Sequence, residues 1–323
     1  MTRYRSPIYF IISLQFLLVV LLAGCATTKP NSGQVFNNEN PFKPQLKTQK
    51  SRSTPSLSKA PDTKSLPEIT PKEIEQAADL MFLRGNLPMA FVKYDECLKS
   101  DPENLNVHYK KGLVLLAAGM NQDAIREFER IIEKNKSFVL AHEGLGKAYF
   151  QMRQHSEAEK HFLKALEMDS NLWRSHNFLG IIYDYHERYD EAALNYLAAI
   201  RLEPSFGVLY HNLGVSYYLA GHYQKAVESF QKAIGYDYTE SKTYNTLALA
   251  YAKVGKYPEA LDAFTKGGDK AKAYNNLGCF FLAEKKYTEA INCFEKAMAT
   301  SPKFYTRANE NLSIAQIALH RDS

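Results

Sequence analysis

Few side chains in this chain are of types and spacings that could carry out chemistry. His108, His142 and His176 are spaced 34 residues apart, and imidazole both binds zinc and titrates near neutral pH. The sequence contains no serine-hydrolase nucleophile elbow, no phosphate-binding loop and no His-Glu-x-x-His motif. The carboxylates fall mostly on the faces of the expected helices that point outward, as exposed Glu–Lys pairs do. We therefore predict that the protein is not an enzyme and uses neither a cofactor nor a small-molecule substrate.

Small and aromatic residues recur in three columns along the chain. The first column is alanine: Ala90, Ala124, Ala158, Ala192, Ala226, Ala260 and Ala290. The second is glycine or alanine: Ala78, Gly112, Gly146, Gly180, Gly214, Ala248 and Gly278. The third is aromatic: Tyr94, Phe128, Phe162, Tyr196, Phe230, Phe264 and Phe294. Each column advances by 34 residues, with a last step of 30, and such a period indicates stacked structural repeats.

This pattern resembles the tetratricopeptide repeat, a helix-turn-helix unit, over residues 71–319. The resemblance implies an all-α fold, a right-handed α-α superhelix of about seven repeats with a C-terminal capping helix. We place the repeats at 71–104, 105–138, 139–172, 173–206, 207–240, 241–270 and 271–304. The capping helix and tail then occupy 305–323, and Thr70, Pro71 and Glu73 predict a capping box at the first helix.

The sixth repeat departs from this period. It is four residues short, and Gly267-Gly268 stands where the other repeats continue their second helix. We expect one helical turn to be missing there, with a local change in superhelix pitch and some flexibility. The alternative is a deletion without structural consequence.

Neighbouring repeats of this kind lie roughly 10 Å apart, too far for the three histidines to share one zinc ion at about 2 Å. We expect them to pack between helices with their ring nitrogens bonded locally, and we predict no metal site. Cys97 replaces an alanine of other repeats and should be buried. Cys279 and Cys293 fall on the two helices of one repeat, on faces expected to point apart, so no disulfide is expected.

In this family the first helix of each repeat lines the inner groove, so the resemblance points to residues on those helices. The candidate binding residues are Asn177, Ile181, His211, Asn212, Val215, Tyr218, Asn245, Leu249, Asn275 and Asn276. Amides one repeat apart can pair with the backbone of an extended peptide while apolar positions take its side chains. The alternative is that these are ordinary packing residues. The Lys and Asn pair that clamps a C-terminal carboxylate in chaperone-binding relatives occurs in no repeat.

The N-terminal residues have the pattern of a signal peptide. Arg3 and Arg5 precede an apolar run over 8–22, which as a helix spans about 22 Å, short of a bilayer core of about 30 Å. This favours a cleaved signal peptide over a permanent membrane span. Without the two arginines the net charge of +5 falls to about +3, too weak and dispersed to predict nucleic-acid binding.

Leu22-Ala23-Gly24-Cys25 resembles a bacterial lipoprotein processing site. The resemblance implies a lipoprotein signal peptide over 1–24, acylation of Cys25 by diacylglycerol, typically palmitate-bearing, and an outer-membrane, periplasm-facing location because Ala26 is not aspartate. The alternative is an uncleaved anchor or a chance match. Residues 25–70 then form an acylated cysteine and a disordered linker rich in Pro, Ser and Lys. Its excess of four positive charges could rest on anionic lipid, or the linker could be a solvated spacer.

Together these features predict a lipid-anchored scaffold that binds a protein or extended peptide in its concave groove. Lipoproteins of this layout resemble pilotins and tight-adherence lipoproteins, which assemble secretins or pilus machines, and we favour this reading. The alternative is an adaptor that recruits a protease or peptidoglycan hydrolase to the envelope. Tyr109, Tyr185 and Tyr218 are too scattered for a glycan-stacking surface, and the second helices are too charged for a self-associating protein.

Overall fold

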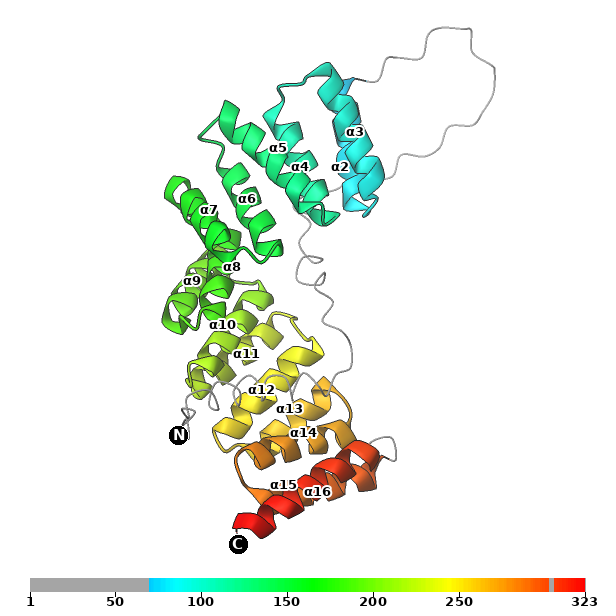
Figure 1. Cartoon of the computed structure of the whole chain (residues 1–323), viewed down its shortest axis with the longest axis vertical. Coiled ribbons are helices and arrows are strands. Elements are labelled where there is room, and N and C mark those ends of the chain that lie inside the picture. The colour runs from blue at the N-terminus through cyan, green and yellow to red at the C-terminus, as the bar shows by residue number, and fades with distance from the viewer. Residues whose placement is uncertain (1–69, 302–304, 323) are drawn as a thin grey trace, which may run out of the picture. The chain divides into compact units, whose positions relative to one another are not determined.

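The computed structural model describes residues 70–301 and 305–322, which contain fifteen helices and no strand (Figure 1). The first helices of the repeats are α2 (Pro71–Leu83), α4 (Leu105–Ala117), α6 (Val139–Gln151), α8 (Trp173–Tyr185), α10 (Gly207–Leu219), α12 (Ser241–Lys253) and α14 (Lys270–Ala283). The second helices are α3 (Leu87–Ser100), α5 (Asn121–Lys134), α7 (His155–Met168), α9 (Tyr189–Leu202), α11 (Tyr223–Gly235), α13 (Tyr257–Gly267) and α15 (Tyr287–Thr300). Helix α16 (Tyr305–Asp322) follows. The predicted all-α fold of about seven repeats and a capping helix is confirmed.

The described residues form two compact units that divide within α8. The N-terminal unit comprises 70–179 and the C-terminal unit 180–322 without the undescribed 302–304. From α2 to α7 and from α9 to α16, each helix packs against the helix before it, as expected of stacked helical repeats.

The aromatic column packs directly on the glycine column. A Cβ atom added to Gly112 would lie 2.5 Å from the ring of Phe128, and one added to Gly214 would lie 2.7 Å from the ring of Phe230. Gly144, in the following repeat, also lies against the Phe128 ring, where a Cβ would lie 2.6 Å from it. The ring thus fills the space between the two helices of its own repeat and also contacts the next repeat. The aromatic side chains of this column are completely or almost completely buried.

The turn between the two helices of each repeat contains one residue with a left-handed backbone. Glycine provides it in four repeats, with φ between 74° and 82°, as predicted from the sequence. In the other three repeats the residue is Arg153, Glu187 or Lys285, with φ of 59° to 60°. A side chain in this conformation costs roughly 1–2 kcal/mol.

Both ends of the array have the expected helix signals. The Thr70 hydroxyl accepts a hydrogen bond from the Glu73 amide (3.3 Å), and the Thr70 amide donates to the Glu73 carboxylate (2.8 Å), which confirms the capping box. In α16, Ala308 and Ala315 are buried. The side-chain amide of Asn311 on the same helix donates to Oδ1 of Asn275 at 3.1 Å, so the last helix closes the final repeat.

The second helix of the sixth repeat is shortened by two or three residues, slightly less than the full turn that the sequence predicted, and only two residues connect it to α14. Helix α13 has 11 residues, whereas the other second helices have 13 or 14. The side-chain oxygen of Asn245 approaches Gly267 so closely that a Cβ there would lie 2.6 Å from it. The expected flexibility and change of pitch remain predictions.

The leader, the lipidation residue Cys25 and the linker lie outside the described residues. None of the helices in 70–301 and 305–322 has the length and apolar character needed to cross a bilayer.

We predict that Gly214→Val destabilises the protein by about 1–3 kcal/mol, because its side chain would overlap the buried Phe230 ring. Urea unfolding measures this. Gly235→Ala is the matched control, since no atom lies within 4 Å of a Cβ there. Equal stability of the two variants would contradict the ring contact as a packing constraint.

We predict that Lys285→Gly stabilises the protein by about 0.5–1 kcal/mol, because glycine relieves the left-handed strain while adding some unfolded-state entropy. The same unfolding measurement tests it, with Lys285→Ala as the control that retains the strain. A glycine variant no more stable than the alanine variant would refute this account of the turn.

Candidate functional site

The ten predicted groove residues lie on four first helices. Asn177 belongs to the N-terminal unit, and the other nine belong to the C-terminal unit. In that unit α10 contacts α12, and α12 contacts α14. We call the surface formed by Asn212, Val215, Tyr218, Asn245 and Asn276 the first-helix face; each of these residues is partly exposed. Ile181, on α8, is also partly exposed.

Three of the predicted residues are buried. His211 is 7% exposed, and its Nδ1 lies 3.1 Å from the Thr243 hydroxyl. Asn275 is 1% exposed and accepts the hydrogen bond from Asn311 of the capping helix. Leu249 is also buried in the core. These three side chains therefore connect neighbouring repeats in this structure and are not exposed for a ligand.

Burial explains the electrostatics of His211. It lowers the pKa of the imidazole to about 3, with a further lowering from the nearby Lys242 ammonium. The ring is therefore neutral at physiological pH, and its contact with Thr243 is a hydrogen bond between two uncharged groups.

An aromatic cluster with one cation borders the first-helix face. The rings of Tyr218 and Tyr223 lie 5.4 Å apart. The Lys253 ammonium lies 5.6 Å from the Tyr223 ring and 5.8 Å from the Phe280 ring, and it pairs with Glu284 at 2.5 Å. Burial raises the pKa of Tyr218, so its hydroxyl stays protonated. The sequence analysis included Tyr218 but missed Lys253, a residue of α12 that contacts side chains of α11 and α14.

The two tyrosines of the aromatic column each donate to an aspartate on the first helix of the same repeat. Tyr94 donates to Asp79 at 2.6 Å, and Tyr196 donates to Asp184 at 2.8 Å. The Lys110 ammonium forms an ion pair with the other carboxylate oxygen of Asp79 at 2.8 Å. No sequence prediction included these pairs, although the change from phenylalanine to tyrosine in the column was a visible signal.

First-helix charges in the N-terminal unit are paired internally. Lys110 also contacts Glu75 at 2.6 Å. Lys147 pairs with the buried Glu143 at 2.5 Å, and the Ser175 hydroxyl donates to the same carboxylate at 3.2 Å. Although burial would raise the pKa of Glu143, Lys147 and its other donors lower it overall. The charged side chains of this unit are thus largely neutralised by one another.

The histidines are bonded locally, as expected. His108 Nε2 lies 3.0 Å from the Pro102 carbonyl oxygen, and its Nδ1 lies 2.6 Å from Glu127. His142 Nδ1 lies 3.3 Å from Nδ1 of His161, so at most one of the two nitrogens carries the proton. Within 70–301 and 305–322, no three His, Cys, Asp or Glu side chains are placed to hold a metal ion. Cys97, Cys279 and Cys293 are free thiols, and Cys97 is buried as predicted.

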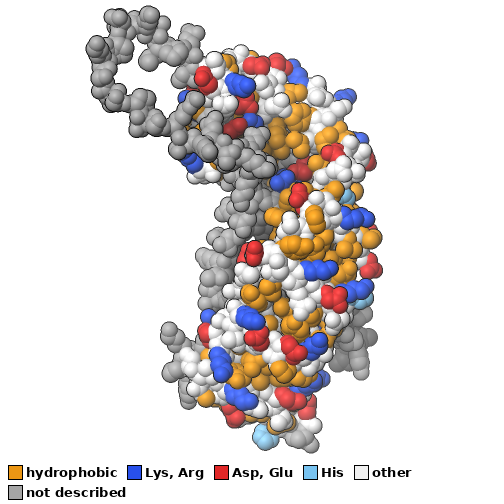
Figure 2. Space-filling model, turned by 180° about the vertical axis from the view of Figure 1, so that it is seen from behind, with side chains coloured by type: hydrophobic (Ala, Val, Ile, Leu, Met, Phe, Trp, Pro, Cys, Tyr) orange, Lys and Arg blue, Asp and Glu red, His pale blue; other side chains and the backbone are white. Residues whose placement is uncertain are grey.

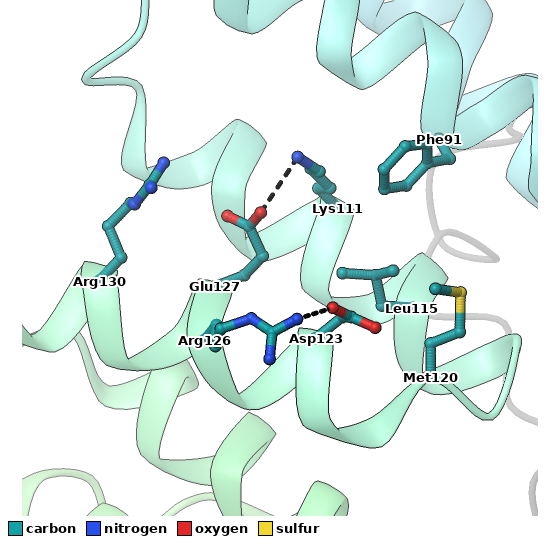
Figure 3. Close-up of a pocket in the computed structure, with 8 residues that line it drawn as sticks. All are labelled: Phe91, Lys111, Leu115, Met120, Asp123, Arg126, Glu127 and Arg130. Atoms are coloured by element: carbon teal, nitrogen blue, oxygen red, sulfur yellow. Dashed lines mark hydrogen bonds and ion pairs between the residues drawn. The ribbon is translucent and has the colours of Figure 1, made fainter.

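A small pocket of about 250 Å³ lies among α3, α4 and α5 in the N-terminal unit (Figure 3). Figure 3 shows Phe91, Leu115 and Met120 on one side and charged side chains on the other. Arg126 contacts Asp123, and Lys111 pairs with Glu127 at 3.0 Å. The pocket is smaller than typical small-molecule sites, and these charged side chains are paired with one another.

The face seen in Figure 2 mixes apolar side chains with both signs of charge. A surface that binds a polyanion would be expected to carry mostly positive charge. Neither sign of charge dominates the described part of this face.

Comparison with known proteins identifies the repeats. Models of the tetratricopeptide repeat match residues 94–172, 208–239 and 271–304, which fall in both units. Residues 94–172, 208–239 and 271–304 are therefore tetratricopeptide repeats, a motif that generally mediates binding to other proteins and scaffolding. The fold is thus one that is typically non-enzymatic.

Among solved structures, a tetratricopeptide repeat protein from Parabacteroides merdae ATCC 43184 shares the fold, with a TM-score of 0.51 and 16% identity. The match covers 76% of this chain and 98% of that one. A crystal structure of MamA is 26% identical, covering 50% of this chain and 94% of that one, with a TM-score of 0.44.

A curated relative is the TPR repeat-containing thioredoxin TTL4 of Arabidopsis thaliana, 26% identical over 91 residues. The match covers 28% of this chain and only 13% of the relative, so it is confined to a small part of that protein.

The His142–His161 pair predicts acid sensitivity in the third repeat. Burial lowers the pKa of His161 to about 4, with a further lowering from His142 and Lys160 that Glu157 partly opposes, and burial and Lys164 lower the pKa of His142. Because the unfolded chain binds protons more readily, stability contributed by the pair is lost as pH falls from about 6.5 towards 4.

His161→Glu copies the His108–Glu127 pair of the second repeat. We predict that the Tm of this variant falls less between pH 7 and pH 5 than the Tm of the wild type. Thermal unfolding across that range measures it. His320→Gln, at an exposed position on α16, should leave the slope unchanged. An unchanged slope in His161→Glu would show that the pair does not titrate with unfolding.

Proposed function

We propose that this protein is a membrane-anchored scaffold that binds an extended segment of a partner protein on the first-helix face. Through that contact it assembles or stabilises an envelope complex of the pilus or secretin type. The observation that carries the binding role is the recurrence of partly exposed amide and apolar side chains on α10, α12 and α14. The envelope role rests on the lipoprotein-like sequence ending in Cys25.

The chemistry of this face suits an extended chain. Asn212 and Asn276 lie at the same position of the fifth and seventh repeats, where amides can exchange hydrogen bonds with a peptide backbone. Val215 and Tyr218, on the same helix as Asn212, provide partly exposed apolar surface. In the N-terminal unit the first-helix charges are paired with one another, so its first helices present a different surface chemistry.

We predict that a photo-crosslinking amino acid at Tyr218, introduced in cells, captures a secretin or pilus component. Tyr236 is the matched control, since it is an exposed tyrosine that lies beyond the end of α11. Tyr218→Ala should weaken binding of the captured partner at least about tenfold, as the loss of a central aromatic contact does.

The same cells test the anchor. Cys25→Ser should move the protein out of the membrane fraction and abolish incorporation of an alkyne-labelled fatty acid. Capture from position 236 but not 218 would show that the first-helix face is the wrong site. Capture of a protease or cell-wall hydrolase at 218 would replace the assembly role with recruitment.

A further inference from the structure

One acidic side chain interrupts an apolar column on the first helices. Position 12 of the repeats holds Phe82, Leu116, Phe150, Asp184, Tyr218, Ala252 and Leu282. Asp184 is the only charged member of this column. Ile181, one turn before it on α8, and Val215, in the next repeat, are apolar and partly exposed. A carboxylate in such surroundings requires donors, because an unpaired buried charge is costly.

Asp184 has too few donors in the described chain. It accepts one hydrogen bond, from Tyr196, through Oδ2, whereas Oδ1 is buried without a hydrogen-bond partner. The Ser216 hydroxyl lies close enough to lower the pKa of Asp184, but it also donates to the Tyr189 carbonyl oxygen at 3.2 Å, so it is shared between the two acceptors. A carboxylate can accept about four hydrogen bonds, so most of the capacity of this group is unused.

The first repeat shows what completes such a pair. Asp79 accepts the Tyr94 hydroxyl in the same way, and the Lys110 ammonium binds its second oxygen at 2.8 Å. In 70–301 and 305–322 no lysine or arginine forms an ion pair with Asp184. The C-terminal unit therefore contains a tyrosine–aspartate pair that lacks the cation present in the N-terminal unit.

The surroundings of Asp184 favour a cation. Burial raises the pKa of Asp184 to about 6, against the hydroxyls of Ser216 and Tyr196, which lower it. Burial raises the pKa of Tyr189 too, and the charges of Glu187 and Asp184 add to that rise, which places a second carboxylate near the site. A bound ammonium or guanidinium would be attracted by both carboxylates.

We infer that Asp184 binds a lysine or arginine side chain of the partner segment and so selects a basic residue at one point of that segment. This rests on the proposed function, because it names the chemistry of the segment that the first-helix face would hold. The bound cation would complete the Tyr196–Asp184 pair as Lys110 completes the Tyr94–Asp79 pair. A charge-assisted contact of this kind also fixes the register of the bound segment.

A random 12-residue peptide library displayed on phage tests this on the full-length chain purified in detergent. The comparison variant combines Asp184→Leu with Tyr196→Phe, which copies Leu116 and Phe128 of the second repeat. Asp184→Asn is a second variant that keeps an acceptor for Tyr196. Tyr218→Ala is the control for loss of the whole face.

The wild type should select peptides with a basic residue among apolar ones, and neither Asp184 variant should. Replacing that basic residue by norleucine should weaken binding to wild type at least tenfold and leave binding to the double variant unchanged. The double variant should melt about 2–4 °C higher, since it removes a poorly solvated acid.

Selected peptides without a basic preference, or the same preference in the Asp184 variants, would overturn this inference and leave the proposed function intact. A double variant that melts lower than wild type, with unchanged peptide selection, would assign Asp184 a structural role only. No enrichment over Tyr218→Ala would overturn the binding function itself.

Discussion

The contact between each buried aromatic ring and the small residue facing it is the constraint on which this structure depends. The Phe128 ring reaches the backbone of α4 only because Gly112 has no side chain, and it also covers Gly144 of the next repeat. One ring thus joins two helices of one repeat and the first helix of the following one. The contact between ring and glycine recurs in five of the seven repeats, and alanine takes the place of glycine in the first and the sixth, so the packing inside each repeat follows one pattern.

That regular packing leaves the first helices free to differ in surface chemistry. In the N-terminal unit, lysines such as Lys110 and Lys147 neutralise carboxylates on the same or the neighbouring first helix. The C-terminal unit instead exposes amides and apolar side chains, with the Lys253–Glu284 pair at their border. The two units therefore share one packing rule and present different groups to a partner.

The sequence predicted the fold because its strongest signals, the three columns and the turn glycines, report packing that repeats. The site was less predictable. Position 5 lies between the exposed surface and the contact with the next repeat, so the burial of His211 and Asn275 depends on Thr243 and Asn311, which lie 32 and 36 residues further along. The tyrosine–aspartate pairs were not predicted because the two aspartates do not form a column in the sequence. Asp79 is at position 9 of its repeat and Asp184 at position 12, one helical turn apart.

The short sixth repeat shows which changes of length such an array accommodates. Each residue of an α-helix turns the chain by about 100°, so a helix that ends three residues early, as α13 does relative to the 14-residue second helices, changes the direction in which the chain leaves by only about 60°. The chain therefore leaves α13 on nearly the same side, and α14 still packs against it after the short Gly268–Asp269 connection. Removing two residues would send the chain to the opposite side. Natural variation in the length of these repeats should accordingly occur in steps of about one helical turn.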